Sequence, residues 1–73
     1  MSILKTIGNN VRGYRHKKDW TQEKLAERAK INVYYLGKLE RGSANISALT
    51  MEKIANCLET STVSLMIENS YKA

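Results

Sequence analysis

The stretch INVYYLGKLERG, residues 31–42, carries polar side chains at helical spacing. On a helical wheel of about 100° per residue, Tyr34, Gly37, Lys38 and Arg41 fall on one side. This side offers a hydroxyl, an ammonium and a guanidinium group, which form hydrogen bonds and ion pairs. A helix that merely faces water would carry mostly Glu, Lys and similar strong helix formers. The composition therefore indicates a surface that contacts another molecule.

Residue types that support catalysis or metal binding are scarce. The chain has one histidine, His16, and one cysteine, Cys57, and its carboxylates are not clustered. A nucleophile would therefore lack a base, and no set of ligands has metal spacing. We expect His16 to be solvated and Cys57 to be a small core or interface residue. The sequence thus predicts a protein that is not an enzyme and that needs no metal or cofactor.

Length and charge limit the kind of partner. The 73 residues suffice for one domain, and 42% hydrophobic residues exceed the range of disordered chains. The formal net charge of +5 favours a polyanion such as nucleic acid. A single cysteine is typical of a reduced compartment, and no signal peptide or membrane-spanning run is evident. We expect a cytoplasmic protein with no membrane partner.

Apolar spacing and capping residues predict an all-α fold of about five helices. The first runs from Ile3 to about Lys17, and the glycines inside it indicate either close packing or fraying. The next three start after an apolar residue followed by a capping residue, a combination found at Thr21, Asn32 and Ser47. The fifth is short and covers residues 63–67, and a polar tail follows at residues 69–73, outside a core of about residues 3–68.

The second and third helices are expected to meet at a sharp corner. The second ends near Ala29, and the third runs from about Val33 to Arg41 before Gly42. Only residues 30–32 separate them, and so short a joint is typical of a helix-turn-helix. The corner would aim the polar side of the third helix outward.

The segments TQEKLAERAKINVYYLGKLERG and NISALTMEKIANCLE resemble the Cro/C1-type helix-turn-helix family of phage and bacterial repressors. The resemblance covers residues 7–67 and implies a five-helix, lambda-repressor-like domain whose third helix lies in the major groove of double-stranded DNA. The short chain and the NIS segment after ERG are more narrowly similar to the controller proteins of restriction-modification systems, which are homodimeric transcriptional regulators.

The resemblance assigns roles to individual residues. Base-reading side chains would come from the first turn of the third helix and one turn on, at Asn32, Val33, Tyr34 and Lys38. Phosphate contacts would come from Gln22, Arg41, Ser43 and Asn45. Arg15 and Glu40 match a structural ion pair beneath the motif. The family often has glycine at the position of Lys30, which would therefore accept strain if the turn needs a positive φ.

Four apolar residues near the C-terminus suggest a second protomer. A short helix cannot bury all of them against one small domain, so we predict a dimer interface at Val63, Leu65, Met66 and Ile67. A dimer would read a palindromic operator with recognition helices about 34–36 Å apart. Occlusion of promoter DNA and placement near RNA polymerase both remain open. The alternative is a protein-interaction module, such as an antitoxin or anti-repressor, although the basic charge favours DNA.

Overall fold

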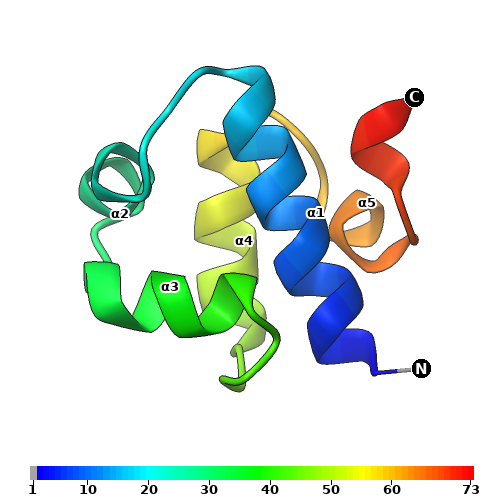
Figure 1. Cartoon of the computed structure of the whole chain (residues 1–73), viewed down its shortest axis with the longest axis horizontal. Coiled ribbons are helices and arrows are strands. Elements are labelled where there is room, and N and C mark those ends of the chain that lie inside the picture. The colour runs from blue at the N-terminus through cyan, green and yellow to red at the C-terminus, as the bar shows by residue number, and fades with distance from the viewer. Residues whose placement is uncertain (1) are drawn as a thin grey trace.

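The computed structural model describes residues 2–73, which form five α-helices and one C-terminal 3-10 helix (Figure 1). They are α1 (Ile3–Lys17), α2 (Gln22–Ala29), α3 (Val33–Glu40), α4 (Ala48–Cys57), α5 (Thr62–Met66) and η1 (Ser70–Lys72). The prediction of an all-α, five-helix domain is confirmed. Within residues 2–73, no helix has both the length and the apolar character needed to cross a membrane.

Capping side chains fix where the helices begin. Thr21, Asn32 and Ser47 accept hydrogen bonds from first-turn backbone amides of α2, α3 and α4 at 2.7–3.2 Å. Each such cap typically contributes about 1 kcal/mol. The three predicted starts therefore lie at the observed residues. At the other end, α3 stops at Glu40, one residue before the predicted Arg41.

The corner between α2 and α3 has the predicted sharp geometry. Lys30 follows α2 in the left-handed region, with φ 57°, and its conformation turns the chain so that α3 can start three residues later. The Ile31 backbone N–H donates to the Ala26 carbonyl at 3.0 Å and closes the end of α2. A residue other than glycine in this region bears strain of about 1–2 kcal/mol. Lys30 bears that strain in the folded protein, and its conformation sets the angle between α2 and α3.

The core lies between the helices, and α1 packs against α3, α5 and η1. Helices α2, α3 and α4 lie on one side of α1, and α5 and η1 lie on the other (Figure 1). Each α-helix contributes a fully buried apolar side chain; these residues are Val11, Leu25, Leu36, Ile54 and Leu65. Helix α3 is thus held by the same core that holds α5.

A glycine allows α1 and α3 to approach closely. A Cβ atom at Gly8 would lie 2.3 Å from the Leu39 carbonyl oxygen and 2.8 Å from the Glu40 carbonyl oxygen. These acceptors belong to backbone and cannot swing aside. Gly8 therefore marks close packing and not fraying of the helix.

We expect Gly8→Ala to lower the free energy of unfolding by about 1–3 kcal/mol, because α3 must move away from α1 to admit the methyl group. Urea unfolding monitored by circular dichroism would measure the change. Gly37→Ala is the matched control, since its Cβ would meet nothing closer than 3.5 Å. That helical replacement should be neutral or stabilise by up to about 1 kcal/mol. Equal destabilisation of both variants would contradict the close-approach argument.

The segment predicted to be a polar tail folds back onto α1. The ring of Tyr71 covers Gly13, where a Cβ atom would lie 2.3 Å from the ring. The Tyr14 hydroxyl donates to Ser70 Oγ at 3.0 Å, and Lys17 Nζ donates to the Tyr71 carbonyl oxygen at 3.0 Å. Residues 70–72 are therefore packed against the domain and do not extend from it.

The predicted dimer strip divides into one buried and three exposed residues. Leu65 is 0% exposed and lies in the core, so its assignment to a dimer interface is wrong. Asn10 Nδ2 donates to the carbonyl oxygens of Leu65 and Ile67, each at 2.8 Å, and this holds the turn of α5 with Leu65 inward. The other three residues stay exposed, at 59% for Val63, 41% for Met66 and 54% for Ile67.

Candidate nucleic-acid interface

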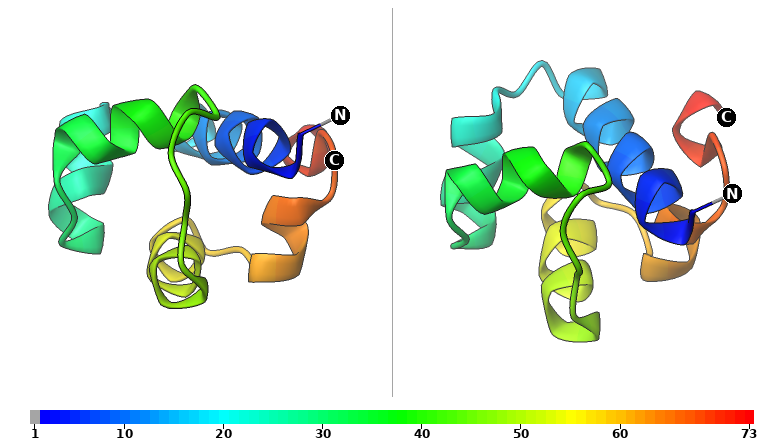
Figure 2. Two further views of the ribbon diagram at one scale, coloured as in Figure 1. Left: turned by 90° about the horizontal axis from the view of Figure 1, so that it is seen from below. Right: turned by 60° about the horizontal axis from the view of Figure 1, so that its bottom comes forward.

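In the right-hand view of Figure 2, α3 runs across the front of the domain with no other helix in front of it. Tyr34 is 82% exposed, and the side chains of Asn32 and Lys38 are also exposed. Val33 is partly buried at the helix start and packs against the core. The four predicted base-reading residues therefore lie on or beside one accessible surface.

Each of these side chains retains chemistry suited to a base edge. The Asn32 side-chain oxygen is engaged as the cap of α3, so its amide N–H groups are the part left to donate. The Lys38 ammonium can donate to guanine O6 and N7, and the Val33 methyl groups can contact a thymine methyl. Tyr34 offers a hydroxyl that both donates and accepts.

Tyr35 has a structural role beside this face. It is half-buried, and its hydroxyl donates to the Asn45 carbonyl oxygen at 2.6 Å. Burial raises the pKa of Tyr35, so the hydroxyl keeps its proton and remains a donor. The bond fastens the α3–α4 loop to α3, and Ser43 and Asn45 are exposed on that loop.

The Ser43 hydroxyl is already bound within the loop. Its Oγ donates to the Lys38 carbonyl oxygen at 3.1 Å, and its backbone N–H donates to the same oxygen at 3.0 Å. A hydroxyl oxygen has one proton, so Ser43 Oγ would have to rotate before it could donate to a phosphate. The exposed amide of Asn45 carries no such bond among the described residues and is the freer donor of the two.

A buried polar network supports the start of α2. Arg15 Nε donates to Glu40 Oε2 at 2.7 Å and Arg15 Nη2 donates to Glu40 Oε1 at 2.9 Å, which forms a bidentate ion pair. Gln22 Nε2 donates to Glu40 Oε1 at 3.1 Å, and Arg15 Nη1 donates to the Trp20 carbonyl oxygen at 2.7 Å. The pair predicted to be structural is thus nearly fully enclosed.

The hydrogen bond from Gln22 to Glu40 was not predicted from the sequence. A primary amide carries two N–H groups, so Gln22 keeps one for a phosphate while the other fixes its side chain. The two residues are 18 positions apart and belong to different helices, so neither spacing nor periodicity could have indicated the contact. Gln22 is therefore held in place by the ion pair beneath it.

Gln22 and α3 enclose a shallow depression, which we name the recognition hollow. It has a volume of about 290 Å³ and is lined by Gln22, Glu23, Val33, Tyr34, Gly37, Lys38 and Arg41. Gly37 lies between Gln22 and Arg41, and a side chain there would contact both. Two cations and one carboxylate line the hollow, so it favours an anion. Within the described chain, no group of three or more His, Cys, Asp or Glu could hold a metal ion.

Comparison with known proteins identifies relatives across nearly the whole chain. Residues 11–65 match the family model described as Helix-turn-helix. The control protein C.SmaI from Serratia marcescens is 33% identical over 72 residues, which cover 99% of this chain and 86% of that protein.

Solved structures agree with these sequence matches. The restriction-modification controller protein C.AhdI from Aeromonas hydrophila is 32% identical with a TM-score of 0.81, over 85% of this chain and 94% of that chain. SinR, from Bacillus subtilis, has been solved in complex with DNA. That complex is 32% identical with a TM-score of 0.80, over 84% of this chain and 98% of the other.

Proposed function

We propose a function for this chain, which belongs to the helix-turn-helix family: it is a sequence-specific DNA-binding transcriptional regulator that controls restriction-modification genes. The observation that carries the proposal is the recognition hollow, where the exposed face of α3 adjoins Gln22 at the start of α2. A helix start presents backbone N–H groups and a partial positive charge, which suit a phosphate. The similarity to C.SmaI and C.AhdI supports the narrower assignment.

The proposed contacts divide into two kinds. Asn32, Val33, Tyr34 and Lys38 would read base edges in the major groove. Phosphates on either side of the groove would bind Gln22, Arg41, Ser43 and Asn45. The regulator would act in the cytoplasm, by occlusion of promoter DNA or by placement near RNA polymerase.

Selection of bound sequences from a random duplex pool tests the proposal. A symmetric pair of half-sites, with centres about 34–36 Å apart, is the expected product. Affinity for random duplex should fall steeply with salt, because phosphate contacts release counterions. A protein-interaction module, such as an antitoxin, would enrich no sequence and would show little salt-sensitive affinity, and either result would refute the proposal.

Lys38→Ala is expected to weaken binding to the selected operator by about 1–3 kcal/mol and to relax preference at one base pair. Lys38 is exposed and forms no side-chain bond within residues 2–73, so its loss should leave the fold intact. Lys53→Ala, at an exposed position of α4, removes the same charge and serves as the control. An unaltered base preference in Lys38→Ala would show that Lys38 is not a base-reading residue.

The exposed strip on α5 supports a homodimer. Val63 and Met66 on α5, and Ile67 just after it, are exposed. A hollow of about 340 Å³ between α4 and α5 is lined by Ala48, Met51, Glu52, Thr62 and Met66. Exposed apolar residues grouped in this way mark an interaction surface. A second copy is the proposed occupant because a palindromic site needs two recognition helices related by symmetry.

A further inference from the structure

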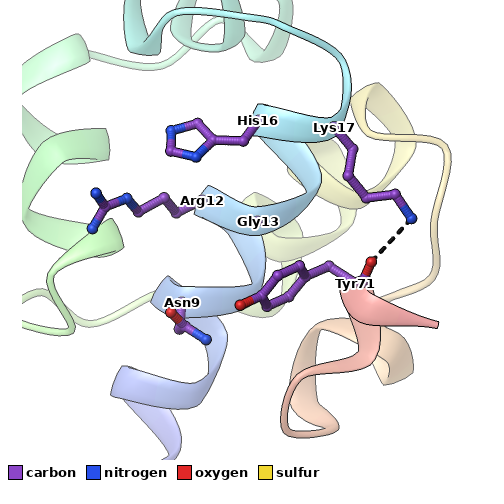
Figure 3. A pocket seen from close by; sticks show the side chains of 6 residues that line it. All are labelled: Asn9, Arg12, Gly13, His16, Lys17 and Tyr71. Atoms are coloured by element: carbon purple, nitrogen blue, oxygen red, sulfur yellow. Dashed lines mark hydrogen bonds between the residues drawn. The ribbon is translucent and has the colours of Figure 1, made fainter.

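Two further depressions lie along α1, beyond the recognition hollow. The first, of about 150 Å³, is lined by Arg12, Arg15, His16, Gln22, Glu40 and Arg41. The second, of about 460 Å³, is lined by Asn9, Arg12, Gly13, His16, Lys17 and Tyr71 (Figure 3). Both are open to solvent and lined mostly by residues with polar side chains, so neither resembles an enclosed site for an apolar small molecule.

The three depressions share residues and therefore form one path. The recognition hollow and the first depression have Gln22 and Arg41 in common. The first and second depressions have Arg12 and His16 in common. A surface channel thus leads from the start of α2 across α1 toward the C-terminal turn.

The path carries three cationic side chains, Arg12, Lys38 and Arg41, and one imidazole, His16. All four side chains are exposed, and none of them forms a hydrogen bond or ion pair with the rest of the described chain. Figure 3 shows Arg12 and His16 projecting to one side of α1, while Lys17 projects to the other side, toward Tyr71.

Three other charged groups of the path already have partners, whereas Glu23, in the recognition hollow, is an exposed carboxylate. Lys17 donates to the Tyr71 carbonyl oxygen, and Arg15 and Glu40 neutralise each other. The path therefore has unpaired positive groups and no unpaired carboxylate along α1, which suits an extended anion.

We propose that Arg12 and His16 bind the sugar-phosphate backbone of the same DNA strand whose phosphate Gln22 contacts, beyond that phosphate. This inference rests on the proposed function. A nucleic acid strand carries a phosphate at every nucleotide. A cationic channel that starts at Gln22 would therefore contact the phosphates that follow the one bound by Gln22. The contacts would add affinity without reading sequence, because phosphates carry no base identity.

Arg12→Gln and the double variant Arg12→Gln/His16→Gln test the proposal against the selected operator. The double variant should weaken binding about tenfold or more, which corresponds to one or two charge-assisted hydrogen bonds. The slope of log affinity against log salt should become shallower by about 1–2, since each phosphate contact contributes about 0.9. The preferred operator sequence should stay unchanged.

Arg28→Gln is the matched control. Arg28 is exposed on α2, lies 5.6 Å from the Trp20 ring centroid, and lines a depression that shares no residue with the channel. Arg28→Gln removes the same charge as Arg12→Gln, so the long-range electrostatic attraction to DNA changes equally in both variants. If Arg12→Gln matches Arg28→Gln in affinity and salt slope, the proposal is overturned.

Replacing operator phosphates one at a time with neutral methylphosphonates locates the contacts. Gln22→Ala identifies the phosphate that Gln22 contacts, because neutralising that phosphate should weaken operator binding by the wild type but not by this variant. Neutralising the phosphates that follow the Gln22 contact along the strand should weaken operator binding by the wild type but not by the double variant. Equal sensitivity of both proteins would exclude the assignment, whereas a wild type that selects no operator would instead refute the proposed function.

Discussion

Glu40→Ala is expected to lower the free energy of unfolding by about 3–5 kcal/mol, because it leaves the Arg15 guanidinium buried without its counter-ion. The side chains of Glu40 and Arg15 are 3% and 9% exposed, so water compensates poorly for the lost carboxylate. The same carboxylate accepts a bond from Gln22, whose amide would lose its anchor. For so small a domain, a loss of this size approaches the whole stability.

The replacement should also reduce DNA binding, although Glu40 contacts no DNA in the proposed complex. Much of that loss would reflect unfolded protein. Urea unfolding and operator titration, measured at a temperature where the variant is folded, would separate the two effects. If Glu40→Ala is as stable as the wild type, the ion pair makes no net contribution to the free energy of unfolding.

The double variant Arg15→Met/Glu40→Leu sharpens the test. Replacing both members of a buried pair with apolar groups of similar size is often neutral or stabilising. Stability should therefore recover, while Gln22 remains without a partner. A residual weakening of operator binding in a fully folded double variant would show that the pair also positions Gln22.

The sequence predicted the helix boundaries well because the signals are local. A capping side chain such as Thr21 or Asn32 and the apolar residue before it lie within a few residues of the helix start that they define. The polar face of α3 was likewise readable, since helical spacing alone places Tyr34 and Lys38 together. Local chemistry thus accounts for most of the fold and for the recognition face.

Contacts between distant segments could not be derived in the same way. Arg15 and Glu40 are 25 residues apart, and only family resemblance indicated their pairing. The packing of Tyr71 on Gly13 joins a segment of polar composition to a helix, and polar composition predicts a tail. The side-chain placement in both cases depends on how α1 packs against its neighbours.

Leu65 shows where periodicity fails in a short helix. The five residues of α5 make little more than one turn, so spacing cannot separate an inner face from an outer one. The deciding contact comes from Asn10, whose amide binds the carbonyl oxygens of Leu65 and Ile67. An asparagine inside the first helix gave no indication of that role.

Met66→Asp is expected to give a folded monomer whose operator affinity falls about 100-fold or more. The fold should persist because Met66 is 41% exposed, and a carboxylate there stays hydrated in the monomer. In the proposed dimer the same carboxylate would be buried against apolar side chains without a partner. Loss of the second half-site removes an avidity gain of about 10²–10⁴.

Leu65→Asp should behave differently, and the contrast makes the test specific. Leu65 is fully buried, so a carboxylate there should unfold the domain and not merely dissociate a dimer. Asn56→Asp adds the same negative charge at an exposed position of α4, outside the apolar strip, and controls for repulsion of DNA. Sedimentation velocity and circular dichroism distinguish the three variants. A dimer that survives Met66→Asp would mean that the two copies meet elsewhere, because no apolar interface tolerates that charge at its centre.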